Sequence, residues 1–269
     1  MPKTKQLDIM NKKNNISKLL LILTSKLRQI CCYIQFQIIV YYFSRQLPVS
    51  KKTAIIFAPH QDDETFACGG IIALKRALGI SVKVVFLTDG SLSIPDGVNP
   101  KKIIDIRQQE ALKALDFLGV APSEITFLNQ IDGSLNQLSY EQINHIVAQL
   151  TELLECFHPE EIYVPYRHDC HPDHEATYSL VKKALSASNF KSELWQYPIW
   201  ILWQNPLNSH LAPSDVANAY RVSIDSVQAQ KHLAIASYHS QIATLPAGFL
   251  NRFFSPYEIF IKNLNTLDN

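Results

Sequence analysis

The sequence predicts an α/β protein in which a mostly parallel β-sheet is sandwiched by helices and preceded by an N-terminal helical extension. From residue 53 onward, short apolar runs of strand length alternate with amphipathic runs of helix length, a pattern typical of parallel sheets. The chain has 269 residues, of which 47% are hydrophobic, enough for one substantial core and an appendage. We therefore expect a basic, apolar helical extension over residues 1–50 and one α/β domain over residues 51–269.

The clearest strands are Thr53–Ala58 and Val82–Leu87, which are continuous apolar runs rich in Val and Ile. Such runs are typical of strands that are covered on both faces. Further strands are expected at Glu124–Leu128, Glu161–Pro165, Glu193–Trp203, Ala219–Ile224 and Tyr257–Ile261. The last three rest on weaker patterns, because the alternation fades after Ser188.

Between these strands, apolar residues recur at helical spacing. The expected helices are Thr65–Leu78, Lys101–Leu118, Tyr140–Phe157, His174–Ala187 and Ser226–Ser237. Gly79 and Gly119 directly follow the first two helices, and a glycine in this place typically ends a helix.

Two clusters of His and Asp residues follow two of the expected strands. His60-Gln-Asp-Asp-Glu64 comes after the first strand, and His168-Asp-Cys-His-Pro-Asp-His174 comes after the fourth. Because ligands bind beyond the carboxyl ends of the strands in such sheets, we expect both clusters at one pocket. A catalytic metal site needs about three N or O ligands and one open position, and it needs side chains that move protons. The sequence therefore predicts a metal-dependent hydrolase.

We assign His60, Asp63 and His174 as the metal ligands, with water in the open position. Two imidazoles and one carboxylate suit Zn²⁺, which lowers the pKa of a bound water towards about 7; Fe²⁺ is the alternative ion. Two other interpretations stay open. Asp62 and Asp63 precede a helix, where Asp commonly caps the first turn, and Cys170 fits either a ligand or a small residue in a tight turn.

These motifs resemble the PIG-L/LmbE-like family of de-N-acetylases, whose usual signatures are Ala-His-Pro-Asp-Asp-Glu and His-x-Asp-His. The resemblance covers about residues 53–262 and includes Leu87-Thr-Asp-Gly90, Arg107-Gln-Gln-Glu110, Leu118-Gly-Val120, Asp132-Gly-Ser134, His239-Ser-Gln241 and Tyr257-Glu-Ile-Phe260. Pro59 and Gln61 depart from the usual Ala and Pro. Gln61 keeps the spacing but places a polar group beside the metal.

The resemblance implies a Rossmann-like fold over residues 51–269. It also implies a zinc-dependent carbohydrate N-deacetylase that releases acetate from an N-acetylglucosamine-type sugar. It implies that Asp62 is the general base and that a protonated His171 stabilises the oxyanion and helps to protonate the leaving amine. It also implies that Asp173 orients an imidazole and that Arg107 and Asp132 contact the substrate. Arg107 has the alternative of pairing with Glu110 on its own helix, and His239 either borders the pocket or is structural.

Two other classes of function stay open. Two His residues and one carboxylate also describe non-haem Fe(II) oxygenases, although a neighbouring carboxylate that suits water activation counts against that chemistry. A non-catalytic sugar-binding or assembly protein is the second class, which the intact set of His and Asp residues disfavours. The acceptor sugar is open, and a lipid-linked or membrane-proximal glycoconjugate is included.

The N-terminal segment is basic and apolar. Residues 1–52 hold ten of the 25 Lys and Arg residues but only one of the 24 acids, so the rest of the chain carries 15 basic and 23 acidic residues. Within the apolar segment Ile16–Phe43, Lys26 and Arg28 lie near the middle, and each costs about 2.5–3.5 kcal/mol at a bilayer centre. We therefore expect a helix that lies in the membrane interface, rather than a span. The alternatives are a helix that packs on the body or on a second subunit, and a terminus that is simply solvated.

The remaining composition bears on location and partners. The five cysteines are odd in number and form no Cys-x-x-Cys pair, which favours a reducing compartment. No small-residue cleavage site follows the apolar segment, which counts against a secretory signal. We expect a cytoplasmic protein, peripheral on the cytoplasmic membrane face, that binds an N-acetylated sugar. An acidic body and an apolar arm count against nucleic acid as a partner.

Overall fold

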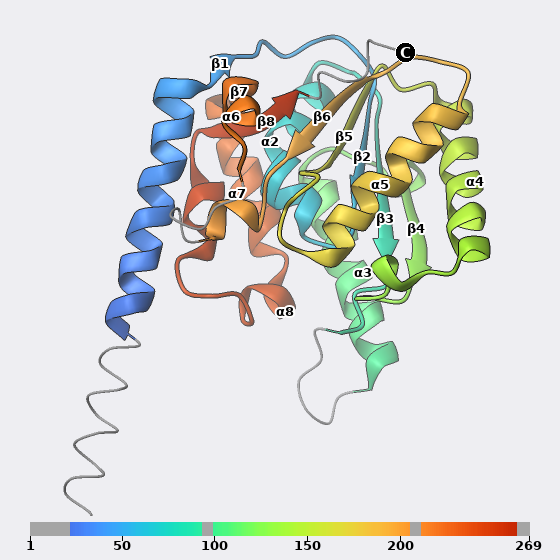
Figure 1. Cartoon of the computed structure of the whole chain (residues 1–269), viewed down its shortest axis with the longest axis horizontal. Coiled ribbons are helices and arrows are strands. Elements are labelled where there is room, and N and C mark those ends of the chain that lie inside the picture. Colours follow the sequence, from blue (N-terminus) through green and yellow to red (C-terminus); the bar gives the residue numbers. More distant parts are fainter. Residues whose placement is uncertain (1–21, 93–98, 205–210, 263–269) are drawn as a thin grey trace, which may run out of the picture.

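The computed structural model describes residues 22–92, 99–204 and 211–262, and the described strands form one eight-stranded sheet (Figure 1). The strands are β1 (Arg45–Gln46), β2 (Ala54–Ala58), β3 (Val82–Thr88), β4 (Ile125–Gln130), β5 (Glu161–Pro165), β6 (Glu193–Tyr197), β7 (Ala219–Ser223) and β8 (Tyr257–Lys262). Their order is β1-β7-β8-β6-β5-β2-β3-β4. Neighbours from β4 to β6 are parallel, and β8 runs antiparallel to both β6 and β7. This mostly parallel sheet confirms the predicted fold class.

Helices cover both faces of the sheet. The layer of α2 (Asp63–Ala77), α3 (Pro100–Phe117) and α7 (Gln228–Ala236) packs on one face, and α4 (Tyr140–Phe157) with α5 (Pro172–Ala187) covers the other (Figure 1). Strand β2 is apolar throughout because both of its faces are buried. Its residues 54, 56 and 58 lie in one hydrophobic cluster and its residues 55 and 57 in the other. Each fully buried aliphatic or aromatic side chain of this kind contributes about 1.5–3 kcal/mol.

Helix α4 and strand β5 have the predicted bounds, whereas the predicted strand Glu193–Trp203 is wrong in its second half. Strand β6 ends at Tyr197, and the chain continues into the 3₁₀ turn η4 (Ile201–Trp203). The reason is a buried carboxylate: Asp169 accepts the backbone N–H groups of Ile199, Trp200 and Ile201. These donors are therefore turned away from the sheet.

Several short elements had no sequence signal. They are β1, α6 (Pro213–Ala217) and α8 (His239–Ile242), together with the 3₁₀ turns η2 (Pro122–Glu124), η3 (Leu135–Gln137), η6 (Asp225–Val227) and η7 (Phe249–Phe254). Elements of two to six residues are too short to show a period. Because β1 pairs with β7, the sheet begins before the predicted boundary at residue 50, and that boundary stays a prediction.

A helix over residues 22–38, closed by the π-helical turn η1 (Ile39–Phe43), runs along one edge of the molecule beside α6 and β7 (Figure 1). Arg28 donates to the carbonyl oxygen of Trp203, and Arg221 donates to that of Val40. Residues 16–21 of the predicted helix lie outside the described residues. Across the described ranges, every helix is too short or too polar to cross a bilayer.

Strands β2 and β5 are neighbours in the middle of the sheet, paired in parallel through Ala54↔Glu161 and Ile56↔Tyr163. Parallel neighbours end at the same edge of a sheet. The two His/Asp clusters, which directly follow these strands, are thereby brought together.

Candidate metal centre

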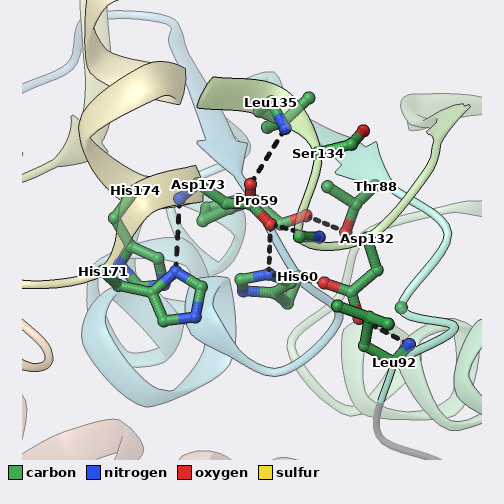
Figure 2. A network of polar contacts seen from close by, with 12 residues as sticks. Pro59, His60, Thr88, Leu92, Asp132, Ser134, Leu135, His171, Asp173 and His174 are labelled. Atoms are coloured by element: carbon green, nitrogen blue, oxygen red, sulfur yellow. Dashed lines mark hydrogen bonds and ion pairs between the residues drawn. The ribbon is translucent and has the colours of Figure 1, made fainter. Parts of the chain in front are cut away.

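The two predicted clusters meet at the carboxyl edge of the sheet. Ring centroids of His60 and His174 are 5.4 Å apart, and His171 lies 4.9 Å from His60 and 4.7 Å from His174. Figure 2 shows the three imidazoles gathered together, with Asp132 and Asp173 beside His60. His60 and His174 are thus close enough to share one ion.

The carboxylate of Asp63 lies between two of these rings. Its Oδ2 atom is 3.1 Å from Nδ1 of His60 and 3.3 Å from Nε2 of His174. In a tetrahedral zinc site with metal–ligand bonds of about 2.0–2.1 Å, neighbouring ligand atoms are about 3.3 Å apart. The carboxylate of Asp63 therefore already has the spacing of such a site from both imidazoles.

The outer ring nitrogens face other carboxylates. Nδ1 of His174 is 2.8 Å from Oδ2 of Asp169. Nε2 of His60 is 3.2 Å from Asp173 and 3.1 Å from Asp132. Carboxylates behind metal-binding imidazoles fix the tautomer and make the inner nitrogen a better donor. Asp173 thus contacts an imidazole as the resemblance implied, and that imidazole is His60.

This arrangement fits a divalent cation. A neutral imidazole has one N–H, and if each ring donates it to the outer carboxylate, both inner nitrogens present a lone pair. Those lone pairs and Oδ2 of Asp63 would then converge as three acceptors. Nε2 of His174 is buried and has no hydrogen-bond partner, because its contact with Asp63 lacks hydrogen-bond geometry. A bound cation would satisfy all three acceptors at once.

The protein's own charges lead to the same conclusion. Burial lowers the pKa of His60, but hydrogen bonds with Asp132, Asp173 and Asp63 outweigh it and hold the pKa well above the ordinary value. Burial also opposes protonation of His174, yet the charge of Asp63 and the contact with Asp169 raise its pKa to about 9. The surrounding carboxylates therefore stabilise positive charge between His60 and His174, either as protons on the rings or as a bound cation.

Two triplets have donor atoms that all lie within 4.8 Å of one another: His60 with His171 and His174, and His60 with Asp132 and Asp173. The second triplet uses the outer nitrogen of His60 and so lies behind the first site. His171 accepts a hydrogen bond at Nδ1 from the backbone N–H of Asp173, at 3.3 Å. We therefore keep Asp63 as the third ligand and His171 as a neighbour.

Asp62 faces the pocket instead of capping the helix. It occupies the N-cap position of α2, but its side chain makes no capping hydrogen bond. Its φ angle of 143° falls in the left-handed region that favours glycine, and such strain is often concentrated at functional sites. Burial and the charge of Asp63 raise the pKa of Asp62 to about 8. A carboxylate with this pKa is a stronger base than an ordinary Asp.

His171 differs from expectation in its charge. Burial and the charges of His174 and His60 lower its pKa to about 4, so the ring is neutral at pH 7 and not protonated. Because Nδ1 accepts the hydrogen bond from Asp173, the proton of the neutral ring belongs on Nε2. His171 is therefore an N–H donor without a full charge.

Arg107 is nearly fully buried and holds the turn that carries Asp62. It donates to the carbonyl oxygens of Gln61 and Gly90, and its Nη2 atom is 3.7 Å from Oδ1 of Asp62. Glu110, the alternative partner of Arg107, accepts hydrogen bonds from the backbone N–H and the hydroxyl of Ser240. Arg107 lines the pocket all the same.

The other expected contacts have mixed outcomes. Asp132 lines the pocket, but its oxygens already contact Nε2 of His60 and the backbone N–H of Leu92. Cys170 is exposed and has a φ of 61° in the turn before α5, which agrees with a turn residue. His239 is exposed at the start of α8, and Gln241 lines the pocket in its place.

Above these residues lies a pocket of about 430 Å³, within the range of about 300–1,000 Å³ typical of small-molecule sites. One wall is aromatic: Trp200 stacks on His171 with ring centroids 6.2 Å apart, and Phe249 lies 4.6 Å from Trp200. His60, Asp62 and Asp63 line the same cavity. The pocket therefore offers an apolar wall beside a charged site.

Asp169 and Trp200 are site residues that the sequence analysis missed. Asp169 is fully buried, and its carboxylate joins His174 to the turn that carries Trp200. Its position within the second cluster was the available signal. Trp200 had none, because it belonged to a segment predicted to be a strand.

A known family and a curated relative match this chain. The PIG-L family, described as GlcNAc-PI de-N-acetylase, matches residues 55–185. The probable N-acetyl-alpha-D-glucosaminyl L-malate deacetylase 2 of Bacillus cereus is 27% identical over 141 residues, which are 51% of this chain and 62% of that protein. The chain thus matches little more than three fifths of the length of that relative.

Solved structures share the fold. The N,N'-diacetylchitobiose deacetylase of Pyrococcus horikoshii aligns with a TM-score of 0.59 at 22% identity, over 79% of this chain and 84% of that one. The 4-carboxy-2-hydroxymuconate hydratase GalB of Pseudomonas putida also aligns with a TM-score of 0.59, at 20% identity, over 75% and 82%. The names of these two enzymes describe different reactions, so the fold alone does not select the chemistry.

Proposed function

Because residues 55–185 match the PIG-L family, we propose that this protein is a metal-dependent hydrolase that removes the N-acetyl group from an N-acetylglucosamine-type sugar. The observation that carries this proposal is the convergence of His60, Asp63 and His174, with Asp62 beside them in the same pocket. The products would be acetate and a free amine. The proposed catalytic domain covers residues 51–269.

In this proposal, His60, Asp63 and His174 would hold the cation. Once bound, the cation would polarise the acetamide carbonyl and lower the pKa of a water. Zn²⁺ suits this ligand set best, and Fe²⁺ is the second choice.

Asp62 would move the proton. It would take a proton from the attacking water and deliver it to the departing nitrogen as the C–N bond breaks. A base works best when its pKa is near the working pH, and burial together with the charge of Asp63 places the pKa of Asp62 at about 8. Arg107 would keep the turn that carries this carboxylate in place.

His171 would bind the carbonyl oxygen. Its Nε2–H would donate to the oxygen as negative charge develops there, which is where a preorganised donor lowers the barrier. A neutral donor suffices for this role, and it leaves proton transfer to Asp62. Trp200 and Phe249 would pack against the apolar side of the sugar.

The test is acetate release from a panel of N-acetylated sugars by the Zn²⁺-loaded and Fe²⁺-loaded protein. We expect Asp62→Asn to bind metal like the wild type and to lose turnover by about 10²–10⁴-fold, whereas His174→Ala should lose both. Near-normal turnover of Asp62→Asn would remove Asp62 from the role of base.

The same assay separates the alternatives. Oxygen uptake without acetate release would indicate an oxygenase, and water addition to an unsaturated acid would indicate a hydratase. Sugar binding without turnover, at full metal occupancy, would indicate a non-catalytic protein. Each of these results would overturn the deacetylase proposal.

A further inference from the structure

The N-terminal helix is fixed on the body by one face. Cys32, Phe36 and Val40 are buried in the hydrophobic clusters of the body. Arg28 adds two hydrogen bonds to the carbonyl oxygen of Trp203 and lies over its ring, with 5.1 Å to the centroid. The helix is therefore held in one orientation, which determines what its opposite face presents.

That opposite face is an apolar stripe. Its members recur at steps of three or four residues, which places them on one side of a helix, and each is at least 41% exposed: Leu23, Leu27, Ile30, Ile34 and Ile38. From the first to the last, the stripe is about 22 Å long at ~1.5 Å per residue. A soluble surface rarely leaves a continuous row of large aliphatic side chains in water. The row therefore needs a covering partner.

Aromatic and basic residues adjoin the stripe. Tyr41, Tyr42 and Phe43 follow it and are 56%, 82% and 54% exposed. Lys26 is exposed within the first turn of the stripe, and Arg45 is exposed beyond its last residue. The sequence has no acidic residue between Asp8 and Asp62, so every charged side chain that this segment contributes is positive. Tyr and Phe beside aliphatic and basic residues are typical of helices that lie in the headgroup region of a bilayer.

We propose that this outward face of residues 22–45 docks the protein on an anionic lipid bilayer. The aliphatic stripe would enter the boundary between headgroups and acyl chains, and the basic residues would contact lipid phosphates. A second copy of the chain is a poorer partner. A two-fold pairing of antiparallel helices would place the basic residues of one copy against those of the other.

Vesicle flotation of the full chain tests this proposal, with phosphatidylcholine vesicles that contain or lack 30% phosphatidylglycerol (about one anionic lipid in three). We expect the wild type to float with the anionic vesicles and to bind the neutral ones at least about ten-fold more weakly. Leu27→Glu combined with Ile34→Glu should lower binding to anionic vesicles by at least about ten-fold.

Leu78→Glu combined with Leu233→Glu is the matched control, because these side chains are 58% and 53% exposed elsewhere on the body. It makes the same change in net charge and should stay within about two-fold of the wild type. Circular dichroism of both pairs checks that the fold is kept. The experiment needs no substrate, so its outcome is independent of the proposed deacetylation.

Three outcomes would overturn the proposal. The wild type could stay unbound with both kinds of vesicle. Both Glu pairs could weaken binding equally, which would indicate a general charge effect. Finally, light scattering could show a dimer that Ile34→Glu dissociates and that ignores vesicles, which would assign the stripe to a second copy of the chain.

Discussion

Replacing Asp169 with Asn exchanges one carboxylate oxygen for an amide nitrogen at the point where His174 meets the turn after β6. Oδ1 of Asp169 accepts the N–H groups of Ile199 and Ile201, and an Asn side-chain oxygen can keep both. Oδ2 accepts the N–H of Trp200 at 3.0 Å and faces Nδ1 of His174 at 2.8 Å. In the Asp169→Asn variant an NH₂ group would replace Oδ2. It would face the N–H of Trp200 and Nδ1 of His174.

The magnitude follows from the hydrogen bond of Trp200, which an NH₂ group cannot accept, whereas the contact with His174 is kept with its direction reversed. A hydrogen bond to a charged group contributes about 1.5–3 kcal/mol, so the free energy of unfolding should fall by about that amount. The effect on metal binding has a different origin. An amide N–H that points at Nδ1 of His174 moves the ring proton to Nε2, which then cannot bind a cation. Loss of such a carboxylate commonly lowers metal affinity by about 10–100-fold.

The assay is competition for Zn²⁺ with a chromogenic chelator, accompanied by guanidinium unfolding of the same samples. Asp215→Asn is the matched control, because Asp215 is also a buried carboxylate but bonds Tyr166 and Arg167 instead of a proposed ligand. We expect the control to lose stability and keep its zinc affinity. If Asp169→Asn binds zinc within two-fold of the wild type while folded, His174 does not bind the ion through Nε2.

Three further predictions concern other parts of the structure. Gly70→Ala would place a Cβ atom 2.3 Å from Cγ2 of Ile224, and overpacking of this kind should lower the free energy of unfolding by about 1–3 kcal/mol; an unchanged denaturation midpoint would contradict the packing. Burial raises the pKa of Glu64 to about 7, from an ordinary value of 4.5. Glu64 therefore adds stability that is complete below about pH 4.5 and is lost as pH rises through about 7. Over that window the wild type should lose about 3 kcal/mol that Glu64→Gln keeps, and parallel pH profiles of unfolding would disprove the shift. Trp200→Ala should raise the KM for an N-acetylated sugar by about ten-fold with kcat nearly unchanged, and a fall in kcat alone would contradict a binding role.

The central part of the sheet was predictable because its strands are buried on both faces. Strand β5 has the predicted bounds, and β2 differs from its prediction by one residue. Continuous burial requires a continuous apolar run, which a sequence displays directly. The turns that follow these strands carry the proposed ligands, so the same signal predicted where the candidate metal centre lies.

The parts that failed depend on partners far away in the chain. The end of β6 is set by Asp169, about thirty residues earlier, through hydrogen bonds to Ile199, Trp200 and Ile201. No local pattern marks such a contact. Asp62 likewise had the sequence of an N-cap, but its φ angle of 143° and the missing capping hydrogen bond distinguish its pocket-facing side chain from a capping one.

The adjacency of β2 and β5 would make binding of the proposed cation dependent on completed folding. His60 and Asp173 are 113 residues apart in the chain, so an unfolded chain offers no comparable set of donors. An ion that binds only the native state stabilises it by mass action, by about 2.7 kcal/mol at a hundred times its dissociation constant. Thermal melting at graded zinc concentrations would thus measure affinity without any substrate. In a cell short of the metal, the same linkage would leave the newly made protein more exposed to proteolysis than its mature, loaded form.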